Sequence, residues 1–257
     1  LAPLLLAVCA AAGCVGTTGG QIVTFSASVA GAEDATTGQP YAFTSDLGWN
    51  VVLTKATLHV GAVYLDQSEP VSGSQGTNCI LPGTYVAEVV SGVDVDLLSP
   101  DPQPFPAAGQ GTTIPPALVG QVWLTQGDVN QPDNDPVLVI AGTAEKAGTS
   151  IPFEGKVTIG TARQVSGASA GGDPICKEHI VSPIPTTVSV GASGSLLLRV
   201  NPKLLFVNVD FSQLAQFSDT YGFSDDPTST QYTQPSRNLY LNLHSAGALY
   251  TFSWTEQ

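Results

Sequence analysis

The chain is poor in charged residues, and poorest in positive charge. Only 11% of its 257 residues are Asp, Glu, Lys or Arg, and 8 Lys plus Arg stand against 21 Asp plus Glu, for a net charge of −13. Proteins that bind nucleic acid need a cationic face for the phosphates, so this balance excludes nucleic acid as a partner. It also argues against docking on anionic lipid through a basic patch. Methionine is absent, which removes the thioether ligands that copper(I) carriers often use.

Long stretches with helical periodicity are also missing. From Gln21 onward, apolar residues recur with a period near two, and the 27 glycines and 19 prolines divide the chain into short segments. This pattern predicts an all-β protein: one antiparallel β-sandwich, immunoglobulin-like or jelly-roll-like, over residues 21–257, with long Pro/Gly-rich loops. A domain boundary inside the proline-rich segment 99–116 is the alternative.

Several local signals refine this prediction. The strongest strand signal is 49–65, with Gly61 as a bulge or bend. Residues 137–161 read as a hairpin turning at 146–149, and 239–254 as a last strand pair turning at 245–247. The only helix expected is a short one at 212–217.

The first residues look like a targeting signal. Leu4 to Ala12 are apolar but too few to span a bilayer as a helix, which is typical of a secretory signal peptide. No initiator Met or basic segment precedes them, so the signal peptide, residues 1–13, is expected to be truncated. An ordinary signal peptide that leaves Cys14 as a free thiol is the alternative.

Ala11-Ala12-Gly13-Cys14 resembles the lipobox of bacterial lipoproteins. The resemblance implies that Cys14 is lipidated and becomes the mature N-terminus, with residues 14–20 as a flexible tether. Val15 follows the cysteine, with no Asp there, and by resemblance to Gram-negative lipoproteins this favours the outer membrane. The globular part is then expected to be periplasmic or surface-exposed, and the membrane, through the lipid, is its first partner.

Two cysteines remain in the body of the chain. In an oxidising compartment Cys79 and Cys176 are expected to form a disulfide. The alternative is a soft-metal site, because Cys176 and His179 are three residues apart and can reach one zinc or copper ion. Cys79 together with His59 or His244 would complete that set.

The three histidines give the best candidate transition-metal site. His59, His179 and His244, assisted by Glu178 or Asp210, supply the ligand types that copper or zinc takes. The alternative is that each histidine is an ordinary surface or core residue.

An acidic loop suggests a second cation. Asp128, Asn130, Asp133 and Asp135 lie within eight residues and carry the oxygen ligands that calcium prefers. The loop is not an EF-hand, and Asx residues also favour plain turns. Asp225 and Asp226 form a weaker acidic pair.

The sequence contains a hydrolase motif, but the residues after it do not suit the structure that this motif needs. Gly167 to Gly171 match G-x-S-x-G around Ser169, and Asp210 and His244 follow in the order of an α/β-hydrolase triad. A nucleophile elbow must lead into a helix, whereas Gly-Asp-Pro follows here. We therefore expect a non-enzymatic binding or structural lipoprotein, with a copper- or zinc-binding periplasmic lipoprotein as the alternative and a serine hydrolase as the second.

Aromatic residues suggest where a partner binds. Trp49, Trp123 and Trp254 lie in apolar strands and are expected in the core. Tyr221, Phe223 and Tyr232 lie in a polar segment that reads as a loop, and this loop is the predicted contact surface for a protein or glycan partner.

Overall fold

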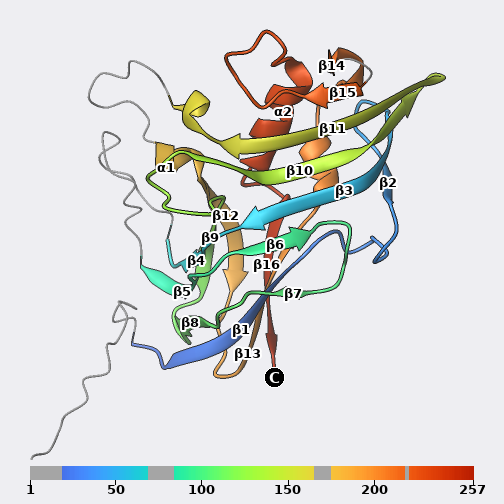
Figure 1. Cartoon of the computed structure of the whole chain (residues 1–257). Coiled ribbons are helices and arrows are strands. Elements are labelled where there is room, and N and C mark those ends of the chain that lie inside the picture. Colours follow the sequence, from blue (N-terminus) through green and yellow to red (C-terminus); the bar gives the residue numbers. More distant parts are fainter. Residues whose placement is uncertain (1–18, 69–83, 165–174, 218–219) are drawn as a thin grey trace, which may run out of the picture.

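Strands dominate the structure, a computed structural model that describes residues 19–68, 84–164, 175–217 and 220–257. They form two sheets, and the all-β prediction is confirmed (Figure 1). The predicted signal peptide, Cys14, Cys79 and Ser169 lie outside the described residues.

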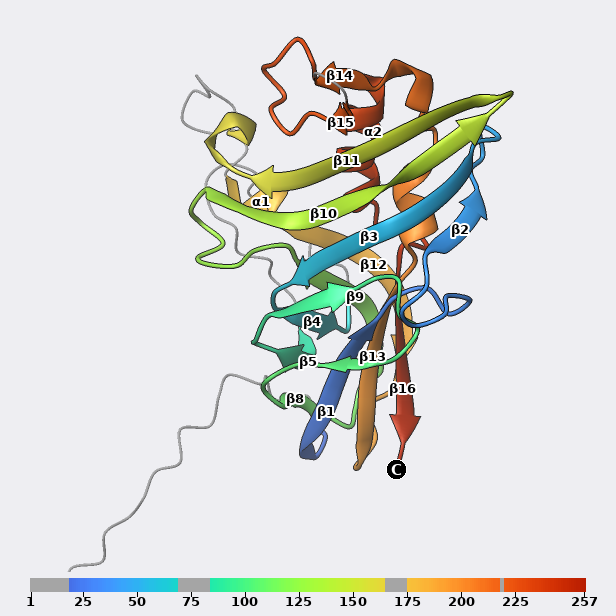
Figure 2. The same ribbon diagram turned by 45° about the vertical axis from the view of Figure 1, so that its right-hand side comes forward.

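The larger sheet has nine strands and is strongly curved. Its strand order is β12 (Ile180–Val188), β9 (Ala117–Trp123), β4 (Val63–Asp66), β5 (Tyr85–Val89), β8 (Gly109–Thr112), β1 (Ile22–Ala30), β13 (Gly194–Val200) and β16 (Tyr250–Glu256), with β7 (Gln103–Pro104) also paired to β1. The two end strands, β12 and β16, contact each other, so the sheet bends back toward itself (Figure 2). Segment 99–116 contributes β7, β8 and the buried Phe105, and is therefore part of this sheet rather than a free connection.

The smaller sheet has seven strands. Its order is β14 (Ala215–Phe217), β15 (Thr220–Phe223), β11 (Thr149–Ile159), β10 (Asp133–Lys146), β3 (Asn50–Val60) and β2 (Tyr41–Thr44), with β6 (Val93–Asp96) paired to β3. Two pairs, β1 with β13 and β11 with β15, run parallel. The sheets are therefore mixed, and the prediction of a purely antiparallel arrangement is wrong. The sequence pattern does not carry this information, because parallel and antiparallel neighbours share the same period of two.

The expected long strand signal divides at the predicted bend. β3 ends at Val60, and β4 begins at Val63 in the other sheet. Gly61 lies between them, where a Cβ atom would come 2.8 Å from the carbonyl oxygen of Thr125. Only a residue without a side chain fits this close approach, so the bend at Gly61 is confirmed.

The hairpin at 137–161 is also confirmed. β10 and β11 pair down to Lys146 and Thr149. The two residues between them, Ala147 and Gly148, have φ of 50° and 82°. A two-residue turn with both φ values positive matches the right-handed twist of the strands it joins.

The helices differ from the prediction. The expected helix at 212–217 is instead a single 3-10 turn, η3 (Phe211–Gln213), followed by β14. The helix of ten residues is α2 (Gln234–Leu243), whose second half, from Leu239, was expected to be a strand. It begins with Pro235 in its first turn and buries Leu239 and Leu243. The short elements are α1 (Ile175–Glu178), η1 (Thr161–Arg163) and η2 (Pro202–Phe206).

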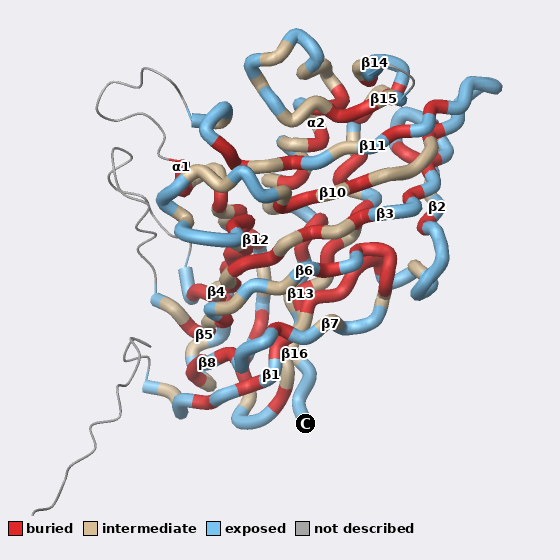
Figure 3. The backbone as a smooth tube through the Cα atoms, in the orientation of Figure 1, coloured by how far each residue is buried: buried red, intermediate tan, exposed pale blue. Residues whose placement is uncertain are grey.

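One continuous hydrophobic core joins both sheets (Figure 3). Phe206 and Phe211, from η2 and η3, are fully buried and pack on Phe153 of β11, whose ring centroid lies 5.0 Å from that of Phe211. Each such phenylalanine contributes roughly 1.5–3 kcal/mol by leaving water. The core holds η2 and η3 in place, and these turns in turn support α2, which contacts both of them.

Candidate functional site

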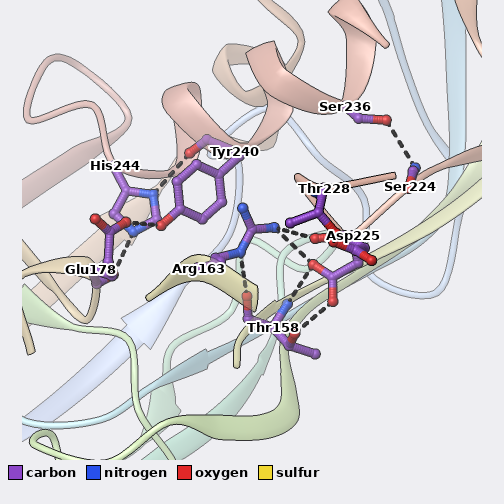
Figure 4. Close-up of polar contacts among 10 residues, drawn as sticks. Thr158, Arg163, Glu178, Ser224, Asp225, Thr228, Ser236, Tyr240 and His244 are labelled. Carbon is purple, nitrogen blue, oxygen red and sulfur yellow. Dashed lines mark hydrogen bonds and ion pairs between the residues drawn. The ribbon is translucent and has the colours of Figure 1, made fainter. Parts of the chain in front are cut away.

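A polar cluster surrounds Arg163, the last residue of η1, which follows β11. Its side chain is only 5% exposed. Nε donates to the carbonyl of Thr158 at 2.7 Å, and Nη2 donates to the carbonyl and carboxylate of Asp225 at 2.9 and 2.8 Å (Figure 4). The same carboxylate accepts from the backbone N–H and hydroxyl of Thr158. Asp225 thus binds the end of β11 to the segment that leads into α2.

The guanidinium also covers an aromatic ring. Arg163 Cζ lies 3.7 Å from the ring centroid of Tyr240 on α2, a cation–π contact. The Tyr240 hydroxyl donates to the carboxylate of Glu178 on α1. Burial, together with this negatively charged partner, raises the pKa of Tyr240 well above its usual range. Tyr240 therefore keeps its proton and acts as a donor that joins α2 to α1.

His244 closes the cluster at the end of α2. Its Nδ1 lies 2.8 Å from the carbonyl oxygen of Tyr240, and its Nε2 lies 2.6 Å from that of Glu178. Carbonyl oxygens only accept, so a ring nitrogen of His244 bonds to its carbonyl only as an N–H donor, and both ring nitrogens face backbone oxygens. We call this cluster, formed by Thr158, Arg163, Glu178, Asp225, Tyr240 and His244, the clamp. Its contacts join α1, α2 and the end of β11, and each of its residues contacts another member.

A second polar group lies in the larger sheet. Asp66 and Gln121 are fully buried, and Gln121 Nε2 donates to Asp66 Oδ2 at 2.6 Å. The other oxygen, Oδ1, has no hydrogen-bond partner among the described residues. Burial raises the pKa of Asp66 to about 6, against the opposing effect of the Gln121 bond. Next to Gln121 along β9, the Trp123 indole N–H points to Gln121 Oε1 at 3.4 Å.

Beside this group lies an aromatic pocket of about 480 Å³. Tyr64 and Trp123 line it, with ring centroids 5.0 Å apart, and the ring centroid of Tyr85 lies 5.3 Å from that of Tyr64. The other lining residues are mostly small or polar, among them His59, Ser91, Thr125 and Gln126. The pocket lining therefore combines aromatic carbon with hydrogen-bonding groups.

His59 is held in this pocket by a carboxylate. Its Nδ1 lies 2.7 Å from Asp94 Oδ1, across the pairing of β3 with β6. The other nitrogen, Nε2, is turned toward Gly92, where an added Cβ atom would lie only 2.8 Å away. The structure therefore fixes the ring of His59 at the edge of the pocket.

The structure does not gather the three histidines. His59 lies on β3, whereas His179 and His244 lie beside α1 and α2. His179 is fully buried, its Nδ1 bonds to the carbonyl of Val129 at 2.9 Å, and burial lowers its pKa. Glu178 is engaged by Tyr240. In the described part of the chain, no three His, Cys, Asp or Glu side chains are placed to share one metal ion.

The acidic loop uses its side chains for its own turns. Asp128 Oδ1 accepts from the backbone and side chain of Asn130 at 2.9 and 3.0 Å, which lowers its pKa. Asp133 accepts from the backbone N–H groups of Asp135 and Gln126. Asp128, Asn130 and Asp133 thus engage one another or nearby backbone in Asx turns, and calcium binding by Asp128, Asn130, Asp133 and Asp135 stays a prediction.

The residues of the predicted partner surface do not lie in one exposed loop. Tyr221 and Phe223 lie in a strand, β15, and Phe223 is 5% exposed and packs in the phenylalanine core. Tyr232 is half-buried beside Arg163. Trp49 is in the core as predicted, whereas Trp123 and Trp254 are only half-buried.

The hydrolase triad is not assembled from its two described members. Asp210 accepts from Ser212 and Gln213, beginning with the Ser212 hydroxyl, and these bonds lower its pKa. It does not orient His244, whose nitrogens face carbonyl oxygens of Tyr240 and Glu178. Cys176 is buried, and its disulfide with Cys79 stays a prediction, since Cys79 lies outside the described residues.

Four residues of these polar and aromatic groups were not predicted as site residues from the sequence: Arg163, Tyr240, Asp66 and Tyr64. Of these, Arg163 had the clearest signal in the sequence, because it is one of only 8 cations and follows a predicted strand. Tyr240 was hidden by the wrong strand assignment over α2. Asp66 and Tyr64 carry no local signal, because their partners come from β5 and β9.

Comparisons with known proteins add no relative: no family model, no curated protein and no solved structure matches this chain. Among the described residues, no helix combines the length and the apolar character needed to cross a bilayer.

Proposed function

We propose that this protein is an exported, lipid-anchored binding module of the bacterial outer membrane, without catalytic activity, and that its aromatic pocket binds a neutral glycan. The lipobox-like Ala11-Ala12-Gly13-Cys14 supports the anchor. The pocket lined by Tyr64 and Trp123 is the observation that carries the binding role.

The lining of the pocket suits a sugar. A pyranose ring has apolar C–H faces that stack on aromatic rings and hydroxyl groups that exchange hydrogen bonds at its edge. Tyr64 and Trp123 supply the rings, and His59, Thr125 and Gln126 supply polar groups. The net charge of −13 repels acidic polymers, so a neutral glycan is the better candidate.

We also infer that the two sheets pack as a sandwich. A single core that takes residues from both sheets supports this arrangement, although the contact between β12 and β16 brings the larger sheet near to closure.

The test is a binding measurement on the full chain. Maltohexaose, cellohexaose and chitohexaose are titrated while Trp fluorescence and heat are recorded. We expect saturable binding of one of them, weakened about 3- to 10-fold in Trp123→Ala or Tyr64→Ala, which is the range of a single aromatic contact. Trp254→Phe, which changes a half-buried tryptophan outside the pocket, is the matched control. Loss of binding in the control alone, or binding of none of the three sugars, contradicts the proposal.

A transition-metal role remains as a second proposal, supported by His59. Metal-binding histidines commonly donate their second nitrogen to a carboxylate, and Asp94 sits in that position. The probe is zinc or copper added to untagged protein. Stoichiometric metal that is lost in His59→Ala supports this role, and retention of the metal in that variant rejects it.

A further inference from the structure

Charge is unevenly distributed along the chain, and the uncharged stretches meet at one end of the larger sheet. Residues 19–32, 102–127 and 180–198 contain no Asp, Glu, Lys, Arg or His. They build β1, β7, β8, β9 and β12 and the first part of β13. By contrast, β3, β6, β10 and β11 of the smaller sheet carry Lys55, Asp94, Asp96, Glu145, Lys146, Glu154 and Lys156, among others.

Pairing brings the ends of these uncharged segments together. The backbone of Gln21 hydrogen-bonds to Thr113, at the end of β8, in both directions. The chain then runs through Ile114 to β9, where Ala117 lies opposite Val188 of β12. We call residues 20–22, 113–118 and 187–193 the uncharged rim. β1 and β8 lie at the lower end of Figure 1, whereas α2, β14 and β15 lie at the upper end.

Large aliphatic side chains stand out from this rim. Ile22 is 62% exposed, Ile114 is 53% exposed and Leu118 is 51% exposed. In a chain that is only 11% charged yet carries a net charge of −13, an end with exposed isoleucine and leucine and so little charge is unusual. Carboxylates border this rim: the fully buried Asp66 lies opposite Val119, and Glu256 of β16 lies opposite Gly194, with a carboxylate oxygen 3.4 Å from where a Cβ atom of Gly191 would be.

The rim is also the end at which the N-terminal segment joins the body. Cys14 to Gly20 are seven residues, which span at most about 25 Å when fully extended. If Cys14 is acylated, the rim cannot be farther than this from the membrane. A short tether makes contact between two attached surfaces effectively intramolecular, so weak affinity is enough to dock them.

We propose that the uncharged rim docks on the headgroup region of a zwitterionic phospholipid bilayer, with Ile22, Ile114 and Leu118 entering the boundary between headgroups and acyl chains. This inference rests on the proposed anchor at Cys14. Aliphatic side chains gain free energy at that depth, whereas carboxylates would be costly there and would be repelled by anionic lipids. Docking by the rim leaves α2, β14 and β15 directed away from the bilayer.

The test places a fluorescent amino acid at position 118 or, as a matched control, at position 241. Leu241 of α2 is 57% exposed, comparable to Leu118, but lies at the opposite end. Each full-length protein is anchored in phosphatidylcholine vesicles that contain spin-labelled lipid. We expect quenching at position 118 to exceed that at 241 at least threefold. Equal quenching at the two positions overturns the proposal.

A second variant series makes the result independent of the label. Ile114→Glu and Leu118→Glu are exposed changes that we expect to leave the melting temperature unchanged. Each is expected to lower the docked fraction about 5-fold, as loss of a half-buried aliphatic contact would. An unchanged docked fraction in both variants contradicts docking by the rim. A dimer that forms without vesicles and is lost in Leu118→Glu would assign the rim to a second copy of the chain and likewise overturn the proposal.

Acylation of Cys14 and docking of the rim can be tested separately. Mass spectrometry of the N-terminal peptide tests acylation of Cys14, and an unmodified thiol rejects the proposed anchor. The rim is then tested on protein whose Cys14 is coupled to a maleimide lipid, which restores a tether of the same length. Acylated protein that floats with vesicles but shows equal quenching at both positions rejects the rim while leaving the anchor intact.

Discussion

Two carboxylates are withdrawn from water in this molecule, and their surroundings are opposite. Asp225 faces the guanidinium of Arg163 and accepts two further hydrogen bonds from Thr158. Asp66 is fully buried, receives one bond from Gln121, and has an oxygen without a partner among the described residues. A buried charge is tolerable when paired and hydrogen-bonded and costly when it is not. The clamp around Arg163 thus holds its elements together, whereas Asp66 weakens the sheet whenever it ionises.

The comparison also separates structure from function. Every member of the clamp is engaged by another member, so its chemistry serves the fold. The group around Asp66 lies beside the pocket, where Trp123 links Gln121 to the proposed ligand site. Residues that cost stability are more often kept for binding than residues that provide it.

Breaking the clamp gives the largest expected effect. Arg163→Ala removes the partner of Asp225 and the cover of Tyr240, and should lower the free energy of unfolding by about 3 kcal/mol, near the lower end for loss of one member of a buried pair. Denaturant titration measures this loss. Arg237→Ala, an exposed cation on α2, is the control and should change stability by less than about 0.5 kcal/mol. A loss below about 1 kcal/mol for Arg163→Ala would mean that the clamp does not hold α2.

Removing the charge from Asp66 is expected to raise the free energy of unfolding at neutral pH, opposite to the effect of breaking the clamp. Its pKa is near 3.8 in the unfolded chain and about 6 in the folded protein, so the folded state binds the proton more tightly. The contribution of Asp66 to the free energy of unfolding is therefore most favourable below about pH 3.8. It is lost as the pH rises through about 6, a fall of roughly 2 to 3 kcal/mol. Asp66→Asn should abolish this fall and be more stable than the parent at pH 7.5. Thermal unfolding from pH 4 to pH 8 gives the profile, and the same profile in both proteins would show that Asp66 does not titrate as described.

The hydroxyl of Tyr240 tests one bond inside the clamp. Tyr240→Phe keeps the ring under Arg163 but removes the donor to Glu178, and should cost about 1.5 kcal/mol, a usual value for a hydrogen bond to a charged group. Tyr232→Phe, farther from the same guanidinium at 5.9 Å, serves as the comparison. Equal losses in the two variants would argue against a distinct role for the bond to Glu178.

The smallest effect is expected for the ion pair at the pocket edge. Asp94 is 69% exposed, so Asp94→Asn should change the free energy of unfolding by less than about 0.5 kcal/mol, and less still in high salt. A loss above about 1 kcal/mol that persists in high salt would show that His59 and Asp94 support the sheet rather than the pocket.

The sequence supported the broad fold and local turns, because these depend on neighbouring residues. The period of two, the bend at Gly61 and the turn at Ala147-Gly148 are all readable locally. Helix α2 was missed because Leu239, Tyr240 and Leu243 also suit a strand, and the helix is stabilised by packing on η2 and η3, which are distant in sequence from its residues.

The candidate sites were harder to predict for the same reason. The histidines were assigned by residue type, but their partners, Asp94, Val129 and Glu178, are set by sheet pairing and by α1. Phe223 read as a loop aromatic because its neighbours are polar, whereas the parallel pairing of β15 with β11 turns it into the core. Asp66 is buried through pairings with β5 and β9 that no local pattern encodes.

The parallel pairing of β1 with β13 has a consequence for how the molecule is made. Ser26 lies opposite Ser195, so the first strand gains its parallel neighbour only after most of the chain has been synthesised. Closing such a long loop is entropically costly and slows folding. The emerging polypeptide therefore cannot complete the larger sheet early, and the pairing of β1 with β13 waits until the last third of the chain arrives.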